Sequence, residues 1–214
     1  AEAGVMLVRL LGREGQAKID YAKGAITHPF TDVPDWAAPY VAYLYKNSLA
    51  NGTTETTYSP DELCSAQMYC TFALRTLGYS DKSGGDFTYQ NALIYAKQVG
   101  ITDDLLLNGN FTRDQLAAVS YNTLGTSVKG GKTLLLESLV DSGAVSKTAA
   151  APILEKLNNL KKYEQAAAAW KDIKSIDMSA NMTFVFKDGS GMEMKMTMPM
   201  VFKYICNGTD IQME

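Results

Sequence analysis

Two side chains near residue 35 are of the kind that bind a saccharide. Trp36 offers an indole ring, which stacks on the apolar face of a sugar, and the carboxylate of Asp32 accepts hydrogen bonds from sugar hydroxyls. A structural interpretation fits the same residues, with Trp36 anchoring a helix start and Asp32 capping a turn. Both interpretations place them in a loop that leads into a helix, and both residues are kept as ligand candidates.

A second candidate site surrounds Arg113. Its planar guanidinium is well matched to a carboxylate. Thr112 precedes it and Gln115 lies three residues after Thr112, the spacing of a capping box at a helix start. Capping does not exclude ligand binding, so Thr112, Arg113 and Gln115 are all predicted at a helix entrance beside a ligand.

The sequence contains no constellation typical of an enzyme or a metal centre. His28 is the single histidine and is expected in a surface turn. Cys64 and Cys70 lie six residues apart on a predicted helix, about 240° around its axis, which argues against a disulfide between them. The segment 130–133 lacks the earlier glycine of a phosphate-binding loop. We therefore predict a non-catalytic protein without cofactor or metal.

Composition indicates a folded protein that does not bind nucleic acid. The 214 residues are 46% hydrophobic and 20% charged, with a net charge of −3, ordinary values for a globular protein. Nucleic-acid binding requires clustered Lys and Arg, and the densest basic stretch, residues 156–162, is typical of the exposed face of a helix. Apolar runs such as residues 5–11 are too short to cross a bilayer.

One structural unit recurs along the first two thirds of the chain. Three segments end in Leu-Gly at Gly12, Gly78 and Gly125, each after a run with helical apolar spacing. Glycine closes a helix well because it adopts the left-handed conformation at no steric cost. A further helix is predicted before the second and third copies, from the Asp35 cap onward and over residues 89–99. The unit is therefore helix, loop, helix.

These repeats resemble the S-layer homology domain over roughly residues 1–145. The resemblance is carried by the Leu-Gly helix endings, by the start of the third copy and by the run before the second copy, Phe30-Thr31-Asp32-Val33-Pro34-Asp35-Trp36-Ala37. It implies three repeats with pseudo-threefold symmetry, their first helices forming a central bundle. It also implies non-covalent binding of secondary cell-wall polysaccharide, often pyruvylated, in grooves between repeats.

The repeats depart from the family pattern in ways that affect binding. Ser65 stands where the family has Arg in the second repeat, and Thr88 takes the place of Trp36 in the third. The first repeat begins at Ala1, with only the tail of the helix-start motif and without its first helix. An incomplete bundle exposes apolar surface, so we expect dimerisation through the exposed repeat surface, exchange of helices between chains, or tag residues that fill the gap.

The last quarter of the chain has a different pattern. A polar linker is predicted at 146–151 and a helix at 153–170, after which the apolar period switches to two over residues 176–186 and 192–204. With a turn at 188–191 and a third strand near 211, this predicts an antiparallel hairpin or meander with one apolar face. Five alternate methionines, from 192 to 200, fit a core or a pliable surface for hydrophobic ligands better than Cu(I) ligation, because no His or Cys lies among them.

The sequence thus predicts an α+β fold, mainly helical repeats followed by a helix and an antiparallel β module. The expected divisions are 1–27 (the end of a truncated first repeat plus linker), 28–80 (second repeat), 81–148 (third repeat) and 149–214 (an incomplete helix and β module). The predicted function is attachment of a secreted, Gram-positive protein to the cell wall or S-layer, without nucleic acid and without a transmembrane segment. The alternative is a lipid carrier using the methionine face, which distantly resembles the half-barrel of lipoprotein carriers.

Overall fold

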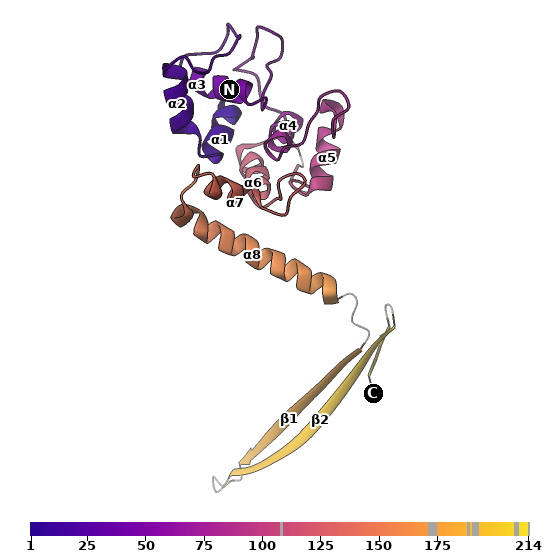
Figure 1. The fold of residues 1–214 in the computed structure, drawn as a ribbon. Helices are drawn as coiled ribbons and strands as arrows, with labels where there is room; N and C mark the ends of the chain where they lie inside the picture. The colour runs from indigo at the N-terminus through magenta and orange to yellow at the C-terminus, as the bar shows by residue number, and fades with distance from the viewer. Residues whose placement is uncertain (108, 171–174, 188, 190–192, 208–209, 214) are drawn as a thin grey trace. The chain divides into compact units, whose positions relative to one another are not determined.

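The computed structural model shows an α+β protein with helices in the first part of the chain and a sheet at its end (Figure 1). It describes residues 1–107, 109–170, 175–187, 189, 193–207 and 210–213. Internal contacts define two compact units, Ala1–Leu157 and Asn158–Glu214. The predicted fold class is confirmed, while the predicted repeat boundaries at 27, 80 and 148 stay predictions.

Short helices joined by long loops build the first unit. They are α1 (Glu2–Leu10), α2 (Glu14–Ala22), α3 (Ala38–Lys46), α4 (Ala66–Thr76), η1 (Tyr89–Asn91), α5 (Ala92–Val99), α6 (Arg113–Leu124), α7 (Leu135–Asp141) and the start of α8 (Lys147–Trp170). The pairs α3 with α4 and α5 with α6 follow the predicted order of helix, loop, helix. Within the described residues, every helix is too short or too polar to cross a membrane.

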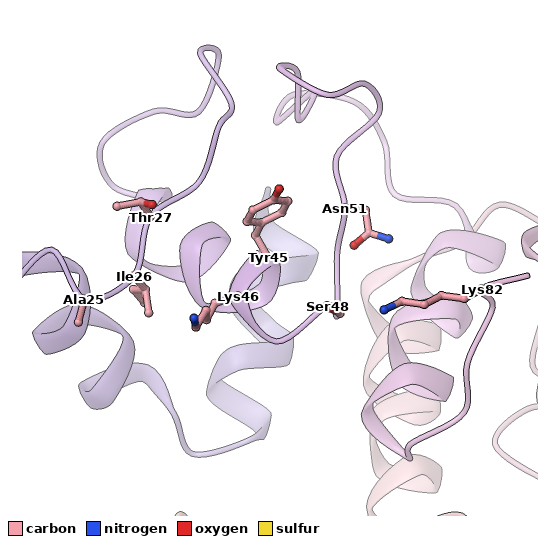
Figure 2. A pocket seen from close by; sticks show the side chains of 8 residues that line it. All are labelled: Ala25, Ile26, Thr27, Tyr45, Lys46, Ser48, Asn51 and Lys82. Atoms are coloured by element: carbon pink, nitrogen blue, oxygen red, sulfur yellow. The ribbon is translucent and has the colours of Figure 1, made fainter. Parts of the chain in front are cut away.

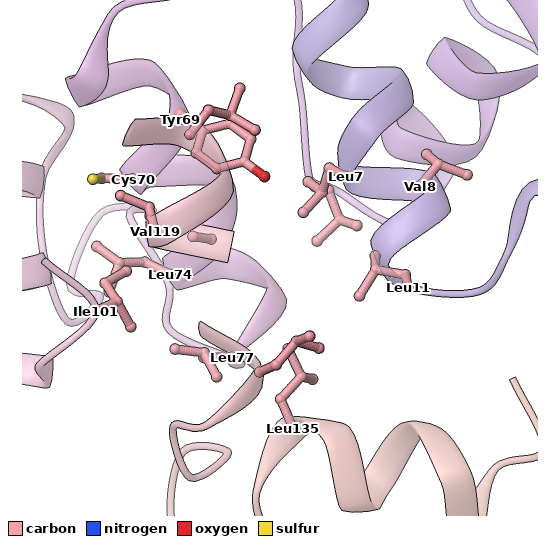
Figure 3. Close-up of a cluster of buried hydrophobic side chains, with 14 of the residues drawn as sticks. Leu7, Val8, Leu11, Tyr69, Cys70, Leu74, Leu77, Ile101, Val119 and Leu135 are labelled. Carbon is pink, nitrogen blue, oxygen red and sulfur yellow. The ribbon is translucent and has the colours of Figure 1, made fainter. Parts of the chain in front are cut away.

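The core of the first unit forms where α1, α4 and α6 come together. These helices contribute Leu7, Leu74 and Val119, all fully buried, to one apolar cluster (Figure 3). Helix α6 contacts both α1 and α4, whereas α3 contacts α1 and α2, and α5 contacts α4. The expectation that the first helices of the repeats form the central bundle is therefore wrong, because the second helices occupy the centre.

Two of the three repeat-ending glycines adopt the left-handed conformation. Gly12 has φ +64° and Gly78 has φ +92°, as predicted from the Leu-Gly pattern. Gly125 has φ −83° instead and continues the right-handed path of α6. Glycine is needed here for close packing against Leu157, because a Cβ on residue 125 would lie 2.7 Å from a methyl group of that leucine.

Helix α3 begins later than the sequence predicted. The chain turns over residues 35–37, and Ala37 takes the capping position without a side-chain hydrogen bond, so the expected Asp35 cap is wrong. Pro39 lies in the first turn, as predicted. Backbone N–H groups in the first turn have no acceptor within the helix, so the lack of an N–H in proline costs no helical hydrogen bond there.

Two stretches expected as linkers are helical. Residues 14–22 form α2, whose Ala17 is buried in the core. Residues 147–151 open α8, because the hydroxyl of Ser146 accepts a hydrogen bond from the Ala149 N–H at 3.1 Å and Ala150 is buried. Burial of Ala17 and of Ala150 against the rest of the unit favours helix over linker in both stretches, so both linker predictions are wrong.

The second unit contains the three-stranded antiparallel sheet, in the order β1 (Ser175–Lys187), β2 (Glu193–Asn207), β3 (Asp210–Met213). The register pairs Met182 with Met198, Phe184 with Met196 and Phe186 with Met194. Because side chains alternate between faces, these pairs share one face, as predicted. The predicted turn at 188–191 and Met192 lie mostly outside the described residues.

Candidate functional site

A groove in the first unit is lined by the starts of three helices, α1, α4 and α6. Its volume is about 1080 Å³, and its lining includes residues 1–4, 50–53, 58–66 and 109–113. These segments are the beginnings of α1, α4 and α6 and the loop between α3 and α4. The groove therefore lies where these three helix starts come together.

Three of the five predicted site residues line this groove, namely Trp36, Thr112 and Arg113. Asp32 and Gln115 do not line it. The two candidate sites that the sequence suggested separately, around Trp36 and around Arg113, are thus brought to one cavity.

Asp32 holds the loop behind the groove in place. Its two carboxylate oxygens accept hydrogen bonds from the backbone N–H groups of Tyr58 and Ser59, each at 2.8 Å. The Tyr58 N–H and then the Ser59 N–H hold the pKa of this carboxyl below its usual range. Tyr58 and Ser59 line the groove, so Asp32 positions its wall, which is the turn role considered for it.

Thr112 and Gln115 form the predicted capping box at the start of α6. The Thr112 hydroxyl accepts from the Gln115 N–H at 3.3 Å, and the Gln115 side-chain oxygen accepts from the Thr112 N–H at 2.9 Å. This geometry fixes the backbone that presents Arg113 to the groove.

Two exposed aromatic rings from separate parts of the chain line the groove. Trp36 is 56% exposed and lies in the turn before α3. Tyr89 is 43% exposed, opens η1, and its carbonyl accepts a hydrogen bond from the Gln67 side chain at 2.6 Å. Tyr89 was not predicted, because the family pattern points to Thr88, one residue earlier, as the counterpart of Trp36.

Arg113 forms an ion pair with Glu2, and both residues line the groove. The contact joins the starts of α6 and α1. Both side chains are largely exposed, 78% for Arg113 and 70% for Glu2. No sequence signal predicted this pair, since 111 positions separate its members.

The capping of α4 corrects the alignment of the second repeat. The Ser65 hydroxyl accepts from the Met68 N–H at 3.1 Å and so caps this helix. Ser65 precedes Gly78 by thirteen residues, and Thr112 precedes Gly125 by the same interval. Ser65 therefore matches Thr112, so its placement at the Arg position was wrong by one residue, and Ala66 stands there.

A second, smaller pocket lies beside the end of α3 (Figure 2). Its volume is about 480 Å³, and Lys46 and Lys82 are its charged lining residues. None of the five predicted site residues lines it. In the described part of the chain, no three His, Cys, Asp or Glu side chains gather as metal ligands.

Comparison with known proteins identifies the family to which one wall segment of the groove is similar. The family model of the S-layer homology domain matches residues 29–65, from just before Phe30 to the cap of α4. Residues 29–65 are a segment of an S-layer homology domain. The matched segment includes Trp36, Asp32 and the loop that Asp32 holds, so it supplies the exposed indole and the neighbouring wall of the cavity.

The chain is also similar to a much longer protein. It is 28% identical over 106 residues to an endoglucanase of Bacillus sp. (strain KSM-635), covering 43% of this chain and 11% of the endoglucanase. The chain therefore spans about a tenth of the length of this relative. No solved structure matches the chain significantly.

The S-layer homology domain gives a general function. Domains of this family are non-catalytic modules that anchor proteins at the bacterial cell surface by binding the cell wall. A cell-surface or wall-anchoring role follows for the matched part of the chain.

Proposed function

We propose that the first unit binds secondary cell-wall polysaccharide in the groove and holds the protein outside the cell, on a Gram-positive wall or S-layer. The observation that carries this proposal is the exposed indole of Trp36, which lies inside the matched segment and lines the groove. Small-molecule sites occupy about 300–1,000 Å³, so a groove of 1080 Å³ has room for a short stretch of sugars.

The groove combines apolar and polar groups in the way that saccharides require. Trp36 and Tyr89 offer aromatic faces for the C–H surface of sugar rings. Thr53, Ser59 and Thr112 add hydroxyl groups to the lining, and Arg113 adds a guanidinium with several donors. Stacking faces beside hydrogen-bonding groups favour a chain of sugars over a purely apolar ligand.

Replacing Trp36 with alanine is expected to weaken wall binding about tenfold or more. Aromatic anchors are the residues whose truncation costs most at an interface, and a tenfold loss corresponds to about 1.4 kcal/mol. The measurement is co-sedimentation of purified protein with cell-wall sacculi over a range of sacculus concentrations, repeated after acid extraction of the wall polysaccharide.

The matched control is Tyr163→Ala, which removes an exposed aromatic ring from α8, outside the groove. It should bind sacculi like the parent protein. Binding that survives acid extraction, or equal binding by Trp36→Ala and Tyr163→Ala, would contradict the assignment of the ligand to this groove.

A second function is favoured by the methionine face of the second unit. Met194 is 68% exposed, and Met182, Met196 and Met198 are also exposed on that face. Burying one such side chain is worth about 1.5–3 kcal/mol, and methionine adapts to irregular apolar partners. We infer that this face holds a lipid or another hydrophobic ligand, as an additional activity of the chain.

Native mass spectrometry with phosphatidylglycerol in detergent micelles checks the lipid proposal. We expect retained lipid, reduced at least several-fold in the double variant Met196→Gln, Met198→Gln, because each substitution removes apolar contact area. The control is Lys195→Gln, on the opposite face of β2. Equal lipid retention by all three proteins would exclude the methionine face as the binding surface.

Dimerisation through the repeat surface stays a prediction, to be measured by solution scattering.

A further inference from the structure

Strand β1 has an unpaired outer edge along its whole length. In the sheet order β1-β2-β3, β1 lies at one side and pairs with β2 alone (Figure 1). Its 13 residues therefore present one row of backbone N–H and C=O groups that no other strand of the described residues pairs. Such a row is a template for a further strand.

The sequence protects the opposite edge of the sheet and leaves this one open. On the outer side of β2, the short strand β3 covers residues 204–207, and Lys195 and Pro199 lie in the remainder. Lysine and proline are the residues with which native proteins block exposed strand edges. Residues 178–186 of β1 include no proline, no glycine and no charged residue. The edge of β1 is therefore suited to strand pairing, whereas that of β2 is not.

Pro199 indicates which backbone groups of β1 face outward. It lies opposite Asn181 in the register. Because proline has no N–H, its nitrogen is tolerated in a sheet where it faces away from the neighbouring strand. Both residues of such a pair turn their backbone groups outward, and their side chains lie close together. Thr183 and Thr197 form the next pair of this kind, and their hydroxyl oxygens lie 3.0 Å apart, which agrees with this assignment.

The sheet is only two strands wide along most of its length. Over residues 193–203, β2 has β1 as its single neighbour among the described strands. A two-stranded hairpin is marginally stable in water, and independent stability requires three or more strands with an apolar face. That face is still open at one end, where Phe186 is 50% and its partner Met194 is 68% exposed. Additional strands would therefore stabilise the second unit.

We propose that the outer edge of β1 pairs with β1 of a second copy of this chain and forms a sheet with four long strands. A two-fold axis makes the two β1 strands antiparallel, and full overlap of their 13 residues places the axis at Asn181. Even-numbered residues then pair with even-numbered residues, so the apolar face continues across the interface. Because Lys195 and Pro199 block the outer edges of the new sheet, assembly ends at the dimer.

Proline substitution tests which edge pairs, by sedimentation velocity of the full chain over a range of concentrations. The parent should form a dimer. Asn181→Pro should stay monomeric, because it removes an outward N–H of β1 and leaves the bonds to β2 in place. The matched control is Val201→Pro, which lies opposite Ser179 and makes the same change on the outer edge of β2; it should dimerise like the parent.

Three outcomes of this experiment would overturn the proposal: a monomeric parent, a dimer that persists in Asn181→Pro, or equal loss of the dimer in both proline variants. Persistence in Asn181→Pro would instead place the dimer contact elsewhere, such as the repeat surface. The measurement involves neither wall polysaccharide nor lipid, so its failure leaves both proposed functions standing.

Cysteine cross-linking tests the same contact without proline. In a background with the three native cysteines replaced by alanine, Asn181→Cys should give a disulfide-linked dimer on oxidation with copper phenanthroline, because the two-fold axis brings residue 181 against its own copy. The control Lys195→Cys lies on the polar face of β2, away from the interface, and should stay largely unlinked. Equal cross-linking of the two variants would contradict pairing through β1.

Discussion

Replacing Gly12 with alanine should destabilise the first unit by about 3 kcal/mol, combining the cost of a left-handed residue with that of overpacking. Gly12 follows α1 and has φ +64°. A Cβ built on it would lie 2.2 Å from the carbonyl oxygen and 2.8 Å from the carbonyl carbon of Ala144. Because the obstacle is backbone, no side-chain rotation relieves the clash, and the segment after α7 must move away from α1.

The control for this substitution is Gly130→Ala. Gly130 has a similar φ of +75°, but nothing lies within 4 Å of its built Cβ. The free energy of unfolding of Gly130→Ala should therefore fall only by the conformational cost of a left-handed alanine, about 1 kcal/mol. Urea denaturation followed by circular dichroism gives both free energies of unfolding. Equal losses in the two variants would mean that the contact between Gly12 and Ala144 does not hold the repeats together.

Features that depend on local sequence could be predicted well. The Leu-Gly endings predicted where α1, α4 and α6 end, because apolar spacing and a closing glycine are local signals. The Thr112 and Gln115 capping box followed from a spacing of three residues. The face shared by the even-numbered residues of the hairpin followed from a period of two.

Features that depend on tertiary contacts could not be predicted. The pattern of one helix does not reveal how many neighbours enclose it, so the central position of α4 was missed. Asp32 carries no signal that its carboxylate bonds to backbone 26 residues away. The helical state of 147–151 was missed because the burial of Ala150 depends on the rest of the unit.

For the candidate site, likewise, the residue types could be predicted from the sequence but their arrangement in space could not. Trp36 and Arg113 were found from their chemistry and from the motifs around them. Their common groove depends on the meeting of three helix starts, and the pairing of Arg113 with Glu2 depends on the same arrangement. A single sequence therefore indicates the kind of ligand group that each residue suits, whereas the structure decides whether the residue is available to it.

Replacing Arg75 with methionine is expected to cost about 3–5 kcal/mol, because it leaves a largely buried carboxylate without its partner. Arg75 donates to both carboxylate oxygens of Asp81, at 3.0 and 2.6 Å, and to the carbonyl of Leu49 at 2.9 Å. The two charged side chains are only 13% and 15% exposed. Arg75 thus connects the loop after α3 and the loop after α4 to α4 itself.

A double-mutant cycle with Asp81→Asn separates this pair from the loss of packing. The double variant should be less destabilised than the sum of the single variants, by about 0.5–3 kcal/mol.

The hydrogen bond from Arg75 lowers the pKa of the Asp81 carboxyl in the folded protein. The pair therefore stabilises the fold fully above the ordinary carboxyl pKa of about 3.9. This stabilisation is lost as the pH falls through the lower pKa of the folded state. The difference in unfolding free energy between parent and Arg75→Met should therefore be full at pH 7 and shrink below about pH 4. A pH-independent difference, or strict additivity in the cycle, would show that Arg75 acts through its aliphatic stem alone.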